Sequence, residues 1–214
     1  MAYVARDSGY AALSLADLAR QSLDLERPQD ALELAQLAQY GSRNSGAAKL
    51  DTFLLTREAW AFVHLNRARE FRRAAGQAVD LFAESDDVSC PAWLESFDEA
   101  ELFGVIGARY RDLASADPRH APLAEQYIQR ALLVRAPNRI RSRTFDLIGL
   151  ARTYLVMAEP EQGCLVARQA VEINGERLHG RPKRKLQEFR HELLPYRNTQ
   201  ASREFSEYLR YLPS

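Results

Sequence analysis

Small residues recur at fixed spacings along this chain, and this repetition limits the folds open to it more than any other feature. Ala151 is followed at +3, +12, +16 and +19 by tyrosine, glycine, alanine and alanine. Similar residues stand at the same offsets from Ala19 and Ala59, and from Gly107 with a longer turn inserted. Two helices approach closely only where side chains are small, so the spacing predicts antiparallel helical hairpins that repeat along the chain.

Apolar residues recur at helical spacing between short breaks, and no hairpin turn joins two alternating apolar runs. The pattern therefore predicts an all-α fold of about ten helices, with boundaries good to a few residues. The expected helices are 10–24, 28–43, 50–65, 68–84, 97–114, 119–135, 140–157, 160–174, 182–194 and 200–212.

Several breaks carry residues that start helices. Ser96 and Glu99 have the spacing of a capping box, in which each side chain satisfies a backbone N–H group of the other. A proline costs least in the first helical turn. Prolines stand at four expected starts, namely Pro28, Pro118, Pro160 and Pro182.

The paired pattern resembles the tetratricopeptide repeat, whose helix pairs carry small residues at these positions. The resemblance implies a right-handed superhelical solenoid of antiparallel helical hairpins. We expect about four hairpins in residues 1–176 and a capping helical pair in residues 177–214. Phe71 departs from the usual alanine, and the turn at residues 114–119 is long. An irregular helical bundle is the alternative architecture.

Three segments resemble a narrower group: residues 91–102, residues 141–151, and residues 193–197 with 203–205. They are similar to the C-terminal repeat region of transcriptional regulators of GC-rich bacteria, which carry a helix-turn-helix domain of the lambda-repressor type. The resemblance implies the sensor or interaction part of such a regulator. No helix-turn-helix precedes Met1, so we expect either a sensor half or a stand-alone relative.

Composition argues against several classes of function. The net charge is zero, which gives no overall attraction to nucleic acid or to anionic membranes. Cys90 and Cys164 have no metal or redox spacing, and the four histidines form no metal motif. The sequence has no signal peptide and no apolar run long enough for a membrane span. We therefore expect a cytoplasmic protein that is not an enzyme and needs no cofactor or metal.

In such solenoids the first helices of successive pairs line the concave face, where we expect a ligand or partner groove. The expected groove residues are Arg20, Phe53, Trp60, His64, Glu101, Arg111, Phe145 and Arg152. The alternative for Phe53 and Trp60 is that they fill the core between hairpins. Asp98 should also lie near Arg141 and Arg143, either as an ion-pair network or as a polar pocket.

The sequence favours a module that binds a peptide, a protein segment or a small effector in that groove. The alternative is a protein–protein scaffold with no small ligand. A basic stretch at residues 177–190 offers a third reading, direct contact with DNA, but we expect DNA to be reached only indirectly through a partner. The last two helices should close the solenoid end; the alternative is that they form the seam of a homodimer.

Overall fold

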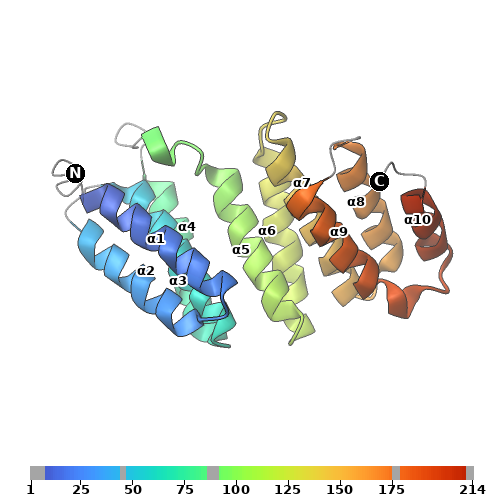
Figure 1. Cartoon of the computed structure of the whole chain (residues 1–214), viewed down its shortest axis with the longest axis horizontal. Coiled ribbons are helices and arrows are strands. Elements are labelled where there is room, and N and C mark those ends of the chain that lie inside the picture. The colour runs from blue at the N-terminus through green and yellow to red at the C-terminus, as the bar shows by residue number, and fades with distance from the viewer. Residues whose placement is uncertain (1–7, 44–46, 86–91, 175–178, 211–214) are drawn as a thin grey trace. The chain divides into compact units, whose positions relative to one another are not determined.

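The computed structural model describes residues 8–43, 47–85, 92–174 and 179–210 (Figure 1). Over these residues the chain forms ten α-helices, and no strand occurs among them. This confirms the all-α prediction. The helices are α1 (Ser8–Asp24), α2 (Pro28–Ser42), α3 (Ala48–His64), α4 (Ala68–Glu84), α5 (Glu99–Ala114), α6 (Ala121–Val134), α7 (Ile140–Val156), α8 (Pro160–Glu172), α9 (Gly180–Glu192) and α10 (Gln200–Arg210). In the same described segments, 3₁₀ turns occur at Ala92–Leu94, Pro118–His120 and Leu194–Tyr196.

The helices divide into two packed units, Met1–Leu102 and Phe103–Ser214, and the division falls inside α5. In the first unit, α1 packs on α2 and α3 packs on α4, while α3 also contacts α1 and α2. In the second, α7 packs on α6 and α8, α9 packs on α7, and α10 packs on α8. Neighbouring helices thus pack as pairs, which is compatible with a stack of helical hairpins. The boundary predicted at residues 176 and 177 lies outside the described residues.

Three of the hairpins share one turn geometry. Glu26, Asn66 and Ala158 each adopt the left-handed conformation, with φ of 58°, 56° and 60°. In each turn the next residue donates its N–H group to a carbonyl five residues back, at 2.8 to 2.9 Å. Such a turn satisfies the carbonyls at a helix end that have no partner within the helix. The same turn therefore recurs at the same offset, +7, from Ala19, Ala59 and Ala151.

The small residues of the repeat pattern lie between the helices, as their spacing predicts. Their side chains are at most 2 % exposed in every hairpin, and they include Ala19, Ala31, Ala35, Ala38, Ala59, Ala75, Ala78, Ala124, Ala131, Ala151, Ala167 and Ala170. Close helix approach at these points excludes larger side chains. The small residues therefore repeat in the sequence because they occupy the contacts between packed helices.

One hairpin keeps this close approach with a different pair of residues. Where the other hairpins place alanine at +16, the α5–α6 hairpin has Ile128, which is 1 % exposed. Its partner position is Gly107, and a Cβ atom there would come within 2.6 Å of Ile128 Cγ1 and 2.9 Å of the Ile128 backbone N. The larger residue on α6 is thus accommodated by the missing side chain on α5.

The observed helix starts agree only in part with those predicted from the prolines and from the capping box. Pro28 and Pro160 are the first residues of α2 and α8, whereas Pro118 opens the 3₁₀ turn before α6. Helix α9 begins at Gly180, two residues before Pro182. The capping box prediction at Ser96 was wrong, because α5 begins at Glu99 and the Asp98 carboxylate accepts the N–H of Glu101 at 2.8 Å.

Each unit has its own aromatic core. In the first unit Phe53 meets Phe97 edge to face, with ring centroids 5.3 Å apart, and Phe71 is fully buried in α4. In the second, Phe189 of α9 meets Phe205 of α10 edge to face at 5.5 Å. Both rings belong to the same hydrophobic core as the buried residues of α7 and α8, so α9 and α10 share the core of the α7–α8 hairpin. None of the helices described combines the length and apolar character needed to cross a membrane.

Candidate functional site

A polar face runs over α5, α7 and α9 in the second unit, and Arg152 of α7 lies at its centre. The Arg152 Nη1 atom is 2.9 Å from Glu188 Oε2, and its Nε donates to Glu192 Oε2 at 2.8 Å. Burial alone would lower the pKa of Arg152, but Glu192, Glu188 and Asp112 outweigh burial and raise it. Because Glu188 and Glu192 are one turn apart, both carboxylates of α9 reach the same guanidinium.

The α5 side of this face carries two arginines and one carboxylate. Arg109 Nη2 lies 3.0 Å from Asp112, and Arg111 also pairs with Asp112. The Arg109 side chain is only 12 % exposed, and burial is the main cause that lowers its pKa. The charges of Arg111 and of Arg181 on α9 lower it further. Arg181 of α9 thus lies close enough to Arg109 of α5 for its positive charge to act on that side chain.

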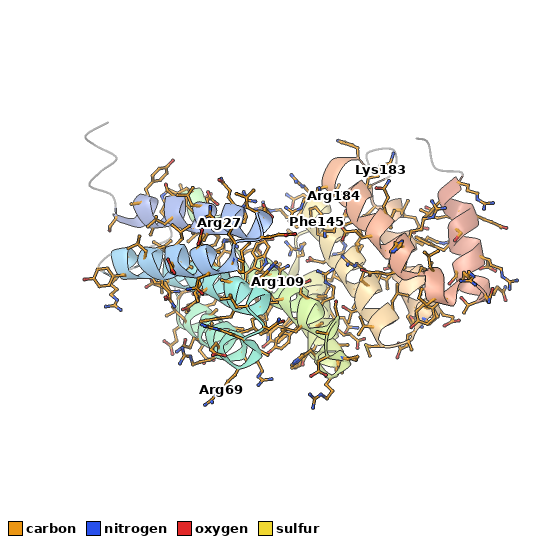
Figure 2. The ribbon with its side chains drawn as sticks, turned by 60° about the horizontal axis from the view of Figure 1, so that its bottom comes forward. Arg27, Arg69, Arg109, Phe145, Lys183 and Arg184 are labelled. Atoms are coloured by element: carbon orange, nitrogen blue, oxygen red, sulfur yellow. The ribbon has the colours of Figure 1, made fainter. Side chains whose placement is uncertain are left out.

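Phe145 lies near two cationic side chains on the same face. The Arg141 Cζ atom is 5.8 Å from the ring centroid of Phe145, and the Arg181 Cζ atom is 5.5 Å from it. Arg141 precedes Phe145 by one turn of α7, whereas Arg181 belongs to the first turn of α9. Both arginines are exposed, and neither forms an ion pair within the described residues. Figure 2 labels Phe145 of α7 together with Lys183 and Arg184 of α9.

A pocket of about 700 Å³ opens beside this aromatic–cation group. It lies where α7 and α9 begin and α8 ends. Its lining consists of Ile140, Arg141, Glu172, Ile173, Asn174, His179, Gly180, Arg181 and Pro182. Such a volume lies within the range typical of small-molecule sites.

Three of the predicted groove residues, Arg111, Phe145 and Arg152, belong to the α5–α7–α9 face. Arg111 and Arg152 are linked through the carboxylates: Glu188 has a lowered pKa although burial opposes this, because Lys185, Arg152 and Arg111 lie near it. Phe145 lies two helical turns from Arg152 on α7. The structure thus gathers these three onto one surface.

The other five predicted groove residues belong to the first unit. Arg20 pairs with Asp24 at 2.9 Å, and Glu101 is half-buried at the start of α5. Phe53 is buried, with the Arg57 Cζ atom 4.3 Å from its ring centroid, so its ring serves the core. The Trp60 indole N–H donates to His64 Nε2 at 3.0 Å.

The predicted grouping of Asp98 with Arg141 and Arg143 joins residues of different units and stays a prediction. Within their own units the three side chains have other contacts. Asp98 caps α5, and Arg143 donates from Nη1 to the Leu132 carbonyl at 3.1 Å. Arg141 contacts Phe145, as described above.

Sequence reasoning missed the contribution of α9, because this helix was expected to be a cap. The spacing of Glu188 and Glu192 contained a signal: two carboxylates one turn apart on an otherwise basic helix. It also missed a buried ion pair, in which Arg135 Nε donates to Asp146 Oδ2 at 2.6 Å. A Cβ atom at Gly104 of α5 would lie 2.8 Å from Asp146 Oδ1 and 2.9 Å from Arg135 Nη2. The ion pair therefore packs directly against the α5 backbone at a position without a side chain.

No group of three or more histidine, cysteine or carboxylate side chains in the described parts of the chain is placed to hold a metal ion. Comparison with known proteins returned no matching family model, no matching curated protein and no matching solved structure.

Proposed function

We propose that this chain is a tetratricopeptide-like binding module, the sensor or interaction part of a bacterial transcriptional regulator in the cytoplasm. It acts by holding a peptide or a small effector, not by catalysis. The observation that carries the proposal is the α5–α7–α9 face, where Arg141 and Arg181 both lie near the Phe145 ring beside a pocket of about 700 Å³.

The face combines features that suit ligand binding. An aromatic ring supplies apolar contact area, and flanking guanidinium groups supply directional hydrogen bonds. The neighbouring ion pairs of Arg152 with Glu188 and Glu192 hold α7 and α9 in register. The ligand groups would thus be held on rigid helices, which lowers the ordering cost of binding.

A ligand that bridges α7 and α9 favours the arrangement in which these helices pack together. In a full-length regulator this differential binding would bias a conformational or oligomeric equilibrium sensed by a DNA-binding partner. DNA is reached indirectly in this proposal.

The alternative is a protein–protein scaffold with no small ligand, and one observation favours it. Leu37 and Tyr40 stand one turn apart on α2 and are 54 % and 68 % exposed. Exposed apolar side chains that are neighbours on a helix can mark a protein-docking surface.

Substitution of one aromatic residue on each surface, the half-buried Phe145 or the exposed Tyr40, separates these functions. Phe145→Ala removes the ring on the proposed face. Tyr40→Ala is the matched control, because the Tyr40 ring also has a guanidinium group near it: the Arg43 Cζ atom is 5.0 Å from its centroid. The protein is incubated with fractionated peptides and small molecules from bacterial extract, and native mass spectrometry records bound mass. We expect a discrete adduct that Phe145→Ala abolishes and Tyr40→Ala retains. An adduct that survives Phe145→Ala would contradict the proposed face, whereas loss with Tyr40→Ala alone would favour the scaffold.

A further inference from the structure

We propose that the pocket between the start of α7, the end of α8 and the start of α9 binds a small organic anion, with Arg141 and Arg181 holding its phosphate or carboxylate group. This inference deepens the proposed function and rests on it, since it assigns the chemistry of the effector that the face would hold.

The two arginines reach the pocket from different helices. Arg141 lies in the first turn of α7 and Arg181 in the first turn of α9, and both line the pocket. Both guanidinium groups also lie near the Phe145 ring, with Cζ atoms 5.8 and 5.5 Å from its centroid. Guanidinium groups pair with phosphate and carboxylate oxygens through two parallel hydrogen bonds. Two of them at one opening can therefore bind one anion together.

No described carboxylate neutralises these cations. Arg141 and Arg181 form no ion pair within the described residues, and the same holds for Lys183 and Arg184 in the first two turns of α9. Among the described residues, the carboxylate that lines the pocket is that of Glu172, which is exposed at the end of α8. By contrast, Arg152 on the same face is paired with both Glu188 and Glu192. The chain as a whole has no net charge, so the excess positive charge at the pocket is local.

The ends of the helices add to this positive potential. Helices α7 and α9 both begin at the pocket, neither has an acidic residue in its first turn, and neither has a side-chain cap. Helices α2, α4 and α8 do carry an acidic residue there. Basic side chains at the positive end of a helix dipole are unfavourable by themselves, and an anion between them relieves this repulsion. The helix ends thus support a site that the arginines define.

The volume and lining of the pocket also indicate the size of the ligand and the character of the part that is not anionic. Ile140 and Ile173 line it together with the polar groups. Asn174 is held in place, since its amide donates to Thr144 Oγ1 at 2.6 Å and to the Ala170 carbonyl at 2.7 Å. A molecule with one anionic group and an apolar or aromatic body fits this mixture better than an inorganic ion does. The pocket volume favours such a molecule over a nucleic acid, whose backbone would track a longer basic surface.

Isothermal titration calorimetry on the full chain tests the site with three probes: adenosine diphosphate, inorganic pyrophosphate and citrate. The variants are Arg141→Gln, Arg181→Gln and, as a matched control, Arg190→Gln, which changes an exposed arginine in the last turn of the same helix. All three side chains are exposed, so the variants should keep the wild-type circular dichroism spectrum. We expect Arg141→Gln and Arg181→Gln each to weaken binding about tenfold, the loss of one charge-assisted hydrogen bond, and Arg190→Gln to have no effect.

The probes separate the two sources of the anionic group. Tighter binding of adenosine diphosphate than of citrate assigns a phosphate ester, and the reverse order assigns a carboxylate; both support the site. The proposal is overturned if no probe binds at millimolar concentration, or if Arg190→Gln weakens binding as much as Arg181→Gln. It is also overturned if duplex DNA displaces the probes and binds more tightly than they do, because the basic face of α9 would then be a nucleic-acid surface.

Failure here is distinguishable from failure of the proposed function. If none of the probes binds but Phe145→Ala still abolishes an extract-derived adduct, the face binds a ligand of different chemistry and only the anion site is refuted. If neither the probes nor the extract gives binding, both the anion site and the proposed binding function are refuted.

Discussion

Replacement of Gly107 by alanine tests whether the α5–α6 hairpin owes its packing to a glycine facing an isoleucine. The added Cβ atom would lie 2.6 Å from Ile128 Cγ1, 2.9 Å from the Ile128 backbone N and 3.2 Å from Tyr127 Cβ. The first two contacts are too short for any real Cβ atom, and isoleucine is stiff at its branched carbon. The helices must therefore move apart.

The size of the effect follows from two opposed terms. Overpacking a close helix contact costs about 1–3 kcal/mol, and the backbone contact places this case toward the upper end. Alanine in place of glycine in a helix returns about 1 kcal/mol. We expect Gly107→Ala to lower the free energy of unfolding by about 1–2 kcal/mol.

Gly76 provides the matched control. It lies inside α4, and a Cβ atom there would meet nothing within 4 Å. The same substitution at this position should therefore stabilise the protein by about 1 kcal/mol. The two glycines then give effects of opposite sign for one chemical change.

A second substitution identifies the residue responsible. Ile128→Ala alone should cost about 2–5 kcal/mol, because it removes a fully buried side chain. Combined with Gly107→Ala, it recreates the alanine pair found at these offsets in other hairpins. The double variant should thus be more stable than the sum of the single effects by about 1–2 kcal/mol.

Urea unfolding followed by far-ultraviolet circular dichroism measures these energies. Hydrogen exchange of peptides from α5 and α6 locates the loss of protection, since Trp60 and Trp93 both lie in the first unit and tryptophan fluorescence does not report on this hairpin. If Gly107→Ala is as stabilising as Gly76→Ala, or if the two substitutions are strictly additive, the reasoning is refuted.

Three further predictions follow from other features. Ala158→Gly should raise the free energy of unfolding by about 0.5–1 kcal/mol, because the alanine is held at a positive φ; urea unfolding that shows destabilisation would contradict this. Asp146→Ala should cost about 3–5 kcal/mol, because it leaves the buried Arg135 guanidinium without its carboxylate; a thermal midpoint equal to that of the wild type would show otherwise. Burial raises the pKa of the Cys164 thiol to about 11, so in a Cys90→Ser variant iodoacetamide should label it slowly near pH 8 and faster as the pH rises toward 11; fast labelling at pH 8 would disprove this.

Much of the local structure was predictable from the sequence because it depends on near neighbours along the chain. The alanine and glycine spacing identified the helix pairs, since only small residues allow close approach. Pro28 and Pro160 marked true helix starts. The capping box at Ser96 failed because Asp98 lies nearer the first turn and its carboxylate is an equally good cap.

The candidate site was only partly accessible in this way. Arg111, Phe145 and Arg152 were placed by the periodicity of their own helices. Periodicity along one helix does not say which helix comes to lie against it. The roles of Arg181 and Glu188 depend on α9 packing on α7, and α9 follows a different hairpin from the one that contains α5.

By itself, then, the sequence determined the helical class, the pairing of neighbouring helices and the positions where those helices touch. These features rest on contacts between residues close in the chain. Only the tertiary structure decided that Arg152 is neutralised by two carboxylates, whereas Arg141 and Arg181 form no ion pair with any side chain that the structure describes. The physical reason is that charge neutralisation depends on distances of a few ångströms between side chains that are 36 to 40 residues apart in the chain, as for Arg152 with Glu188 and Glu192.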